Sequence, residues 1–233
     1  MNHIICVHVG DRYTKDYVEK LYRGLRRHSR EPFQFTILSD GHTYDMTDAN
    51  VRIISVEKYP FVSRSNGWWY KMQAFRCDVV MEGQNMLIDI DTVITGDMDK
   101  FWAYRPDHFV IIQDFNRHFN PGYSRSNSSV VKFTDSIARD IDIKWREDPL
   151  HWVRKYRGDQ DWFDDQIKDK VWWPAPWIRS WKWEVFNGGQ THSHKQEYRS
   201  NHTVLDIQCS ILAFHGKPDP HEVDHDIIKQ NWA

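Results

Sequence analysis

The sequence predicts an α/β protein in which helices flank a mainly parallel β-sheet, organised as a single domain. Strand-like and helix-like segments alternate through the first half of the chain, a pattern typical of β-α-β units. Polar residues follow several strand-like segments, and ligands of such sheets gather at the carboxyl ends of the strands. A length of 233 residues suffices for one domain with a substantial core.

The first half of the chain supplies the alternating elements. An apolar run over 3–9 predicts a strand, and residues 14–28 carry apolar side chains at helical spacing. The elements expected next are a strand over 33–38, a turn at Ser39-Asp40-Gly41, a strand near 51–56, a helix over about 68–79 and a strand over 86–90.

The second half of the chain is less regular. A loop is expected over 113–125, because this stretch contains Asn, Pro and Gly. The other expected elements are a short helix over 97–104, a strand over 108–112, a strand over 127–133, helices over about 134–145 and 149–156, a strand near 178–186, a polar loop around 187–203 and a strand over 211–214.

Composition excludes several classes of protein. There are 31 basic and 33 acidic residues, so the sequence lacks the basic excess that is typical of nucleic-acid binders. The three cysteines are far apart and odd in number, which favours reduced thiols in a cytosolic protein. A strand-like run near the N-terminus has no signal peptide before it, and no apolar run is long enough to cross a bilayer. We therefore expect a cytoplasmic protein without a membrane span.

The most informative stretch is the apolar run 86–94, which contains Asp89 and Asp91. Side chains alternate along a strand, so both carboxylates should leave the end of the strand on the same side. Two such carboxylates repel each other unless a cation or a shared proton intervenes, and a hard divalent metal prefers oxygen ligands. The alternative is a turn with two solvated acids, because turns favour Asp.

A phosphatase is a sharper alternative. An apolar strand followed by Asp-x-Asp-x-Thr resembles the nucleophile motif of haloacid-dehalogenase-type phosphatases, in which the first Asp, here Asp89, becomes phosphorylated. That family normally carries the motif on its first strand. Here more than a third of the chain precedes it, which argues against this interpretation.

Six segments in order carry a second resemblance. They are Gly10-Asp11-x-Tyr13, Lys71 within Trp69-Tyr70-Lys71-Met72, Leu87-Ile88-Asp89-Ile90-Asp91, Asn127-Ser128-Ser129, Gly158-Asp159-Gln160-Asp161 and Phe214-His215-Gly216-Lys217-Pro218. Together they resemble GT-A-fold glycosyltransferases, in particular the retaining family 8-like group that includes glycogenin and bacterial lipooligosaccharide galactosyltransferases. The resemblance spans about residues 4–221.

The resemblance implies a single GT-A catalytic domain over 1–233, with a nucleotide-binding half over about 1–100 and an acceptor and sugar half over about 101–233. It implies transfer of a hexose from a nucleoside diphosphate sugar, usually a UDP-sugar, to a carbohydrate or other hydroxyl acceptor, with retention. The metal would be Mn²⁺ or Mg²⁺. The implied metal ligands are Asp89, Asp91 and His215, a set of oxygen and nitrogen donors that suits Mn²⁺.

The resemblance also implies a set of donor-binding residues. They are Val9, Gly10, Asp11, Tyr13, Asp40, Lys71, Ile90, Asn127, Ser128, Gly216 and Lys217. Glycine permits close approach of phosphate oxygens, and the Lys217 ammonium would neutralise the leaving diphosphate. The sequence departs from its relatives after Lys217, where many have a second lysine and this chain has Asp219.

The implied catalytic residues are Asp159, Gln160 and Lys217. An amide is a poor nucleophile, so Gln160 suggests front-face attack, while Asp159 or Asp161 stays open as a nucleophile. A sugar-nucleotide-binding protein without transferase activity is a further alternative. The sequence does not reveal the donated sugar, the acceptor, which should contact the loops 113–126 and 187–203, or the oligomeric state.

Overall fold

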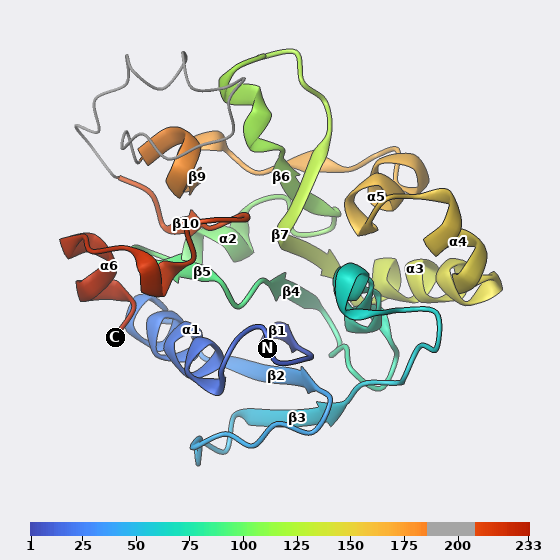
Figure 1. The fold of residues 1–233 in the computed structure, drawn as a ribbon, viewed down its shortest axis with the longest axis horizontal. Helices are drawn as coiled ribbons and strands as arrows, with labels where there is room; N and C mark the ends of the chain where they lie inside the picture. Colours follow the sequence, from blue (N-terminus) through green and yellow to red (C-terminus); the bar gives the residue numbers. More distant parts are fainter. Residues whose placement is uncertain (186–207) are drawn as a thin grey trace.

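The computed structural model describes residues 1–185 and 208–233. A seven-stranded sheet in the order β3-β2-β1-β4-β7-β6-β8 forms the centre of the molecule (Figure 1). Its strands are β1 (Asn2–His8), β2 (Phe33–Ser39), β3 (Val51–Ser55), β4 (Gln84–Ile88), β6 (Val110–Gln113), β7 (Ser126–Thr134) and β8 (Val171–Trp172). A smaller sheet in the order β5-β10-β9 contains β5 (Thr92–Ile94), β9 (Ile178–Ser180) and β10 (Ile211–Ala213). The predicted α/β class is confirmed.

The sheet is mixed, because β7 runs antiparallel to both of its neighbours. The β1–β2, β1–β4, β2–β3 and β6–β8 pairs are parallel, whereas β7 pairs antiparallel with β4 and β6. As a result, β7 begins at the edge where β4 ends, and the Asp89 amide donates a hydrogen bond to the Ser129 carbonyl at 2.9 Å. This arrangement brings the two predicted polar segments side by side.

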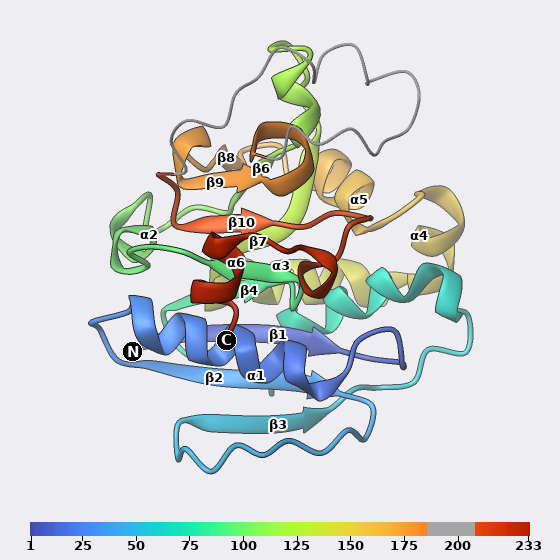
Figure 2. The same cartoon turned by 60° about the vertical axis from the view of Figure 1, so that its left-hand side comes forward.

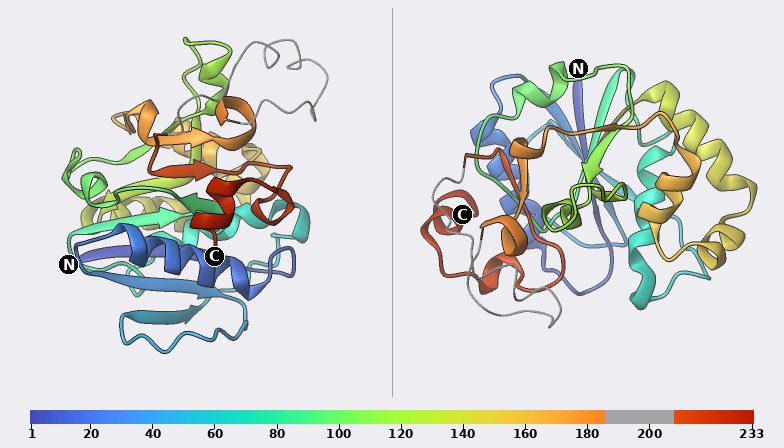
Figure 3. Two further views of the ribbon diagram at one scale, coloured as in Figure 1. Left: turned by 90° about the vertical axis from the view of Figure 1, so that its left-hand side faces the viewer. Right: turned by 90° about the horizontal axis from the view of Figure 1, so that it is seen from above.

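Helices cover both faces of the sheet (Figures 2 and 3). The α-helices of the structure are α1 (Lys15–His28), α2 (Asp99–Ala103), α3 (Asp135–Glu147), α4 (Pro149–Lys155), α5 (Asp159–Gln166) and α6 (Asp226–Asn231). The 3₁₀ and π helices are η1 (Arg64–Phe75), η2 (Phe115–His118), η3 (Ala175–Trp177), η4 (Trp181–Val185) and η6 (Pro220–Glu222). The α1 helix packs Val18, Leu21 and Leu25 into the core on one face. On the other face, Trp69 of η1 stacks on Trp145 of α3 with ring centroids 5.4 Å apart.

Several sequence predictions need correction. The helix expected over 68–79 is a 3₁₀ helix over Arg64–Phe75 with a kink at Asn66. The strand expected near 178–186 ends at Ser180, and a π-helical turn follows over Trp181–Val185. The short elements β5, β8, α5 and α6 were not predicted as separate elements, because each has too few residues for a clear periodic pattern. The loop expected around 187–203 lies outside the described residues.

A buried histidine joins three central strands at the end of the sheet opposite Asp89. The imidazole of His3 on β1 lies between β2 and β4, with Nδ1 2.6 Å from Asn85 Oδ1 and Nε2 2.7 Å from Thr36 Oγ1. One nitrogen of a neutral imidazole donates and the other accepts. Asn85 Oδ1 can only accept, so Nδ1 donates to it and Nε2 accepts from the Thr36 hydroxyl, which satisfies both contacts without a charge. Burial lowers the pKa of His3 to about 4.

We expect this group to make the fold sensitive to acid. Between pH 6.5 and 4 the unfolded chain binds a proton at His3 that the folded chain does not, so the free energy of unfolding falls as the pH falls. The expected loss is about 2–3 kcal/mol, since one pKa unit corresponds to about 1.4 kcal/mol.

Urea unfolding followed by tryptophan fluorescence at several pH values would measure this loss. In His3→Gln, whose amide both donates and accepts but does not titrate, the slope in this pH window should flatten. The exposed His151→Gln variant is the control and should keep the wild-type slope. Equal slopes in all three proteins would contradict the prediction.

Candidate active site

Two adjoining cavities lie where β1 and β4 end and β7 begins. The larger has a volume of about 460 Å³ and the smaller about 280 Å³. Trp68, Lys71, Asp89 and Asp91 line both cavities, which therefore share a wall. Of the other residues that the sequence analysis singled out, the larger cavity is lined by Asn127, Ser128, Asp159, Gln160, Asp161, His215 and Gly216, and the smaller by Val9, Tyr13 and Ile90.

The ammonium group of Lys71, on the shared wall, contacts two of the carboxylates, those of Asp89 and Asp159. Lys71 of η1 donates to Asp89 at 2.8 Å and to Ser128 Oγ at 3.1 Å, and its Nζ lies 3.9 Å from Asp159 Oδ2. Burial by itself lowers the pKa of Lys71, but the charges of Asp89 and Asp159 outweigh it and raise the pKa to about 12. Lys71 is therefore charged at neutral pH and links three elements of the site.

Asp91 lies where its charge is poorly compensated. Burial and the nearby charge of Asp89 raise the pKa of Asp91 to about 7, although the Tyr13 hydroxyl donates to Asp91 Oδ2 at 3.0 Å. Burial and the Asp91 charge in turn raise the pKa of Tyr13, which therefore stays protonated as the donor. A divalent cation beside the two carboxylates would remove this repulsion, so the acid pair fits the predicted metal in its chemistry.

His215 lines the same cavity as the two aspartates. Its ring stacks on Phe115 with centroids 5.0 Å apart and planes inclined by 9°, and its Nε2 lies 2.7 Å from Ser180 Oγ. Such a contact orients an imidazole and fixes its tautomer. Within residues 1–185 and 208–233, no three His, Cys, Asp or Glu side chains form a ready-made metal site. Asp89, Asp91 and His215 therefore share a cavity as candidate ligands, not as a preassembled cluster.

The first turn of α5 faces the larger cavity. Asp159 is 2% exposed, its Oδ2 has no hydrogen-bond partner among the described residues, and burial raises its pKa despite the Lys71 charge. The Ser128 amide donates to Gln160 Oε1 at 3.3 Å, which fixes the side-chain amide beside β7. Asp161 lines the same cavity, but its side chain is more exposed and its carboxylate forms a shorter ion pair, with Arg157 at 3.0 Å.

Four of the singled-out residues line neither cavity: Gly10, Asp11, Asp40 and Lys217. Gly10 has a φ of +76°, a conformation that glycine adopts without strain, and its amide donates to Asp40 Oδ2 at 2.9 Å. Asp40 thus stabilises the turn after β1. The roles that the resemblance assigns to these four residues stay predictions.

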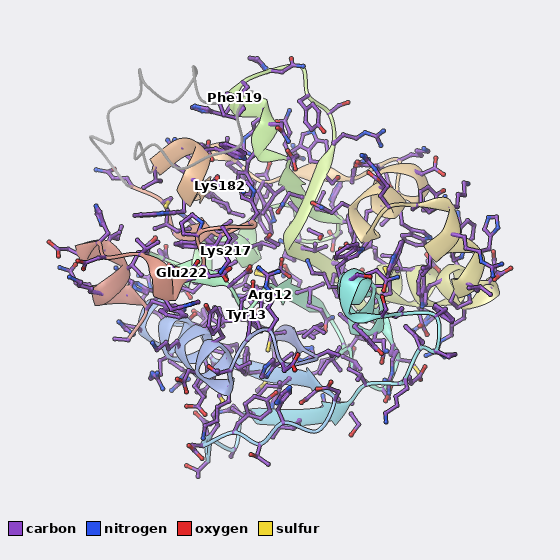
Figure 4. All side chains as sticks on the ribbon, viewed as in Figure 1. Arg12, Tyr13, Phe119, Lys182, Lys217 and Glu222 are labelled. Carbon is purple, nitrogen blue, oxygen red and sulfur yellow. The ribbon has the colours of Figure 1, made fainter. Side chains whose placement is uncertain are left out.

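Lys217 is held by its own segment. Its ammonium lies 2.8 Å from Asp219 Oδ2 and 2.8 Å from Glu222 Oε1, and Arg12 contacts the other Asp219 oxygen at 3.3 Å. Figure 4 shows Arg12, Tyr13, Lys217 and Glu222 close together beside the C-terminal segment. Asp219 is 4% exposed, so the residue at which the sequence departs from its relatives is a buried anchor for two cations.

Sequence reasoning missed two cavity residues that lie against each other. Trp68 lines both cavities and is 44% exposed, which is unusual for the largest aromatic side chain. Gly158, the N-cap of α5, lies beneath its indole, and a Cβ at this position would be 3.1 Å from Trp68 Nε1. Two features of the sequence could have pointed to these residues: the pair Trp68-Trp69 and the glycine directly before Asp159-Gln160.

Comparisons with known proteins identify the fold. No protein-family model and no curated protein match the sequence. Among the described helices, none has the length and apolar character that a membrane crossing requires. The galactosyltransferase LgtC in complex with donor and acceptor sugar analogs has a TM-score of 0.65 at 14% identity, covering 94% of this chain and 88% of that one.

Two other transferase structures are similar. The glycosyltransferase GlyE of Streptococcus pneumoniae TIGR4 has a TM-score of 0.65 at 13% identity over 94% of this chain and 56% of that chain. Mouse xyloside xylosyltransferase 1 has a TM-score of 0.55 at 12% identity over 93% of this chain and 98% of that chain. The chain therefore has the GT-A fold, as its resemblance to the retaining family 8-like glycosyltransferases implied.

Proposed function

We propose that this protein is a metal-dependent glycosyltransferase that moves a hexose from a UDP-sugar to an acceptor hydroxyl with retention. One observation carries the proposal. Lys71 of η1, Asp89 and Asp91 of the turn after β4, and Asp159 and Gln160 of α5 line two adjoining cavities. The GT-A fold supports the same reaction class.

The two cavities suit the two ends of such a donor. The smaller is lined by Val9, Ile90 and Tyr13, whose apolar and aromatic surfaces suit a nucleoside. The larger is lined by Asn127 and Ser128 and by α5, which supply polar groups for a sugar. A donor that spans both would bring its diphosphate to the shared wall.

A diphosphate at that wall would face Asp89 and Asp91, two further anionic groups. In our proposal, Asp89, Asp91 and His215 hold Mn²⁺ or Mg²⁺, which supplies a positive charge to the diphosphate and stabilises the leaving group. Lys71 holds Asp89 in position, and Ser180 orients His215.

Transfer breaks the bond between the anomeric carbon and the diphosphate oxygen and forms a bond from that carbon to the acceptor oxygen, whose proton passes to the departing diphosphate. Retention follows if the acceptor enters on the face that the diphosphate leaves. Gln160 is held by the Ser128 amide and would stabilise positive charge on the sugar ring. Asp159, the buried acid beside it, would do the same as a carboxylate or act as the nucleophile.

Substitution of Asp91 tests the metal. In Asp91→Asn we expect binding of UDP to lose its dependence on Mn²⁺, because a neutral amide is a weaker ligand for a hard cation. Sugar transfer should fall about 100-fold, the usual effect of losing one charge-stabilising group. Calorimetry with UDP in Mn²⁺ or EDTA, and UDP release from a panel of UDP-sugars, would measure both.

The exposed Asp45→Asn variant is the matched control, since Asp45 pairs with Lys15 on the surface. Wild-type binding of UDP that is the same in EDTA and in Mn²⁺ would refute the metal. Binding without transfer to any acceptor would favour the sugar-nucleotide-binding protein. Release of phosphate from an aryl phosphate that depends on Asp89 would favour the phosphatase.

The two acids of α5 provide a second test. Asp159→Asn should lower kcat about 100-fold with UDP affinity within about twofold, because the buried carboxyl faces the sugar cavity. Asp161→Asn should change kcat less than about threefold, since Asp161 is paired with Arg157. Equal losses in both variants, measured by initial rates, would contradict the assignment of Asp159.

A further inference from the structure

One tryptophan of the candidate site is left exposed. Trp68 is 44% exposed, whereas the other tryptophans of the described residues are buried or half-buried. Within residues 1–185 and 208–233, its ring stacks on no other ring and its N–H donates no hydrogen bond. Trp69, the next residue, is 1% exposed and stacks on Trp145. Large aromatic side chains usually gain stability from burial, so an indole that stays open to a cavity is available to a ligand.

The helix that carries Trp68 turns it toward the cavities. η1 is a 3₁₀ helix, in which side chains three residues apart lie on the same side. Trp69 and Met72 form one such pair, and both are buried in the core. Trp68 and Lys71 form the adjacent pair, and both line the two cavities. The core contacts of Trp69 therefore fix the side of the helix on which the indole of Trp68 lies.

Gly158 leaves room for this indole. It caps α5 directly before Asp159, and it lines the larger cavity. A Cβ at this position would lie 3.1 Å from Trp68 Nε1 and 3.4 Å from Trp68 Cδ1, which is tighter than ordinary van der Waals contact. The φ of Gly158 is −171°, an extended conformation that any residue adopts, so the backbone does not require a glycine here. Space favours glycine at this position, because the indole packs against its backbone.

The lining of the larger cavity indicates what the indole binds. The lining is mainly polar and charged, and among its residues only Trp68 and Phe214 have large apolar side chains. Phe214 is 2% exposed and stacks on Trp181, so Trp68 supplies the accessible apolar surface of this cavity. In the smaller cavity, the half-buried Val7 and Val9 provide apolar surface as well. A nucleoside there has apolar contacts without Trp68, whereas a sugar in the larger cavity depends on it.

We propose that Trp68 binds the hexose of the donor by placing its indole against the C–H face of the pyranose ring. This inference rests on the proposed function and adds to it a residue that holds the transferred sugar. A pyranose presents hydroxyl groups at its edge and C–H groups on its faces. Asn127 and Gln160 offer polar atoms to the hydroxyls, and the indole offers the apolar surface that the C–H groups need. Trp68 and Gly158 act as one unit, in which the glycine sets the position of the ring.

Calorimetry with UDP, UDP-glucose and UDP-galactose in Mn²⁺ tests the proposal. The quantity to compare is the dissociation constant of the UDP-hexose divided by that of UDP. In Trp68→Ala this ratio should rise about tenfold for the UDP-hexose that the wild type binds more tightly, because the sugar loses its apolar contact. The affinity for UDP should stay within about twofold. Trp68→Phe should keep most of the wild-type ratio, since an aromatic face remains.

Substitution of Gly158 tests the position of the indole. In Gly158→Ala the added methyl group should displace the ring and raise the same ratio about threefold or more. In the Trp68→Ala background it should add little, because there is then no indole to displace. Ile53→Ala is the matched control and should keep the wild-type ratio, since Ile53 is 54% exposed and lines neither cavity. Thermal melting of all variants would confirm folding.

The outcomes separate this inference from the proposed function. A ratio that is unchanged in Trp68→Ala, whether or not the affinity for UDP falls, would overturn the contact with the sugar. So would a wild type that binds UDP but neither UDP-hexose. Additive effects of the two substitutions would overturn the role given to Gly158. A wild-type protein that does not bind UDP with Mn²⁺ would instead overturn the proposed function itself.

Discussion

The site depends on the ion pairs of one lysine. Asp89, Asp91 and Asp159 line one cavity of about 460 Å³, and three carboxylate charges around one cavity repel each other strongly. Lys71 contacts two of them and Ser128 as well, so a single ammonium joins η1, the end of β4, β7 and α5. Trp69, its near neighbour on the helix, is buried against Trp145, which anchors the segment that carries the charge.

Of these three carboxylates, Asp91 is the one whose negative charge is least compensated by nearby cations. Lys71 satisfies Asp89 and approaches Asp159, whereas the described contact of Asp91 is with a neutral phenol. By contrast, Asp161 and Asp165 of α5 are each paired with a basic side chain. The imbalance is a feature of sites that receive a cation, and it gives the proposed metal its physical basis.

Much of the fold could be predicted from the sequence, because it follows from local patterns. The alternation of apolar segments located β1, β2 and β4. Asp89 and Asp91 line a common cavity as predicted, but they lie in a turn between β4 and β5 that the Thr92 amide closes by donating to the Asp89 carbonyl, so strand alternation is not the reason. The resemblance located Asp159-Gln160 and His215-Gly216, and both pairs line that cavity. These features are encoded within a few neighbouring residues.

The rest depends on contacts between distant segments. The sequence does not distinguish Asp159 from Asp161, since only the packed structure buries Asp159 and brings Lys71 to within 3.9 Å of it. Nor does it reveal that Asp219 binds Arg12 across 207 positions, or that Trp68 lies against Gly158. The kink in η1 and the π-helical turn were likewise missed, because tertiary packing decides them.

The smaller sheet has a mechanical consequence for the site. Thr92, which follows Asp91, pairs with Ala213, two residues before His215, on adjacent antiparallel strands. The separation between the acid pair and the imidazole is therefore set by main-chain hydrogen bonding and not by the conformation of a loop. A slip of one residue in this pairing would turn the side chains of the strand to its other face. The surrounding surface can therefore vary without changing the separation between the acid pair and the imidazole.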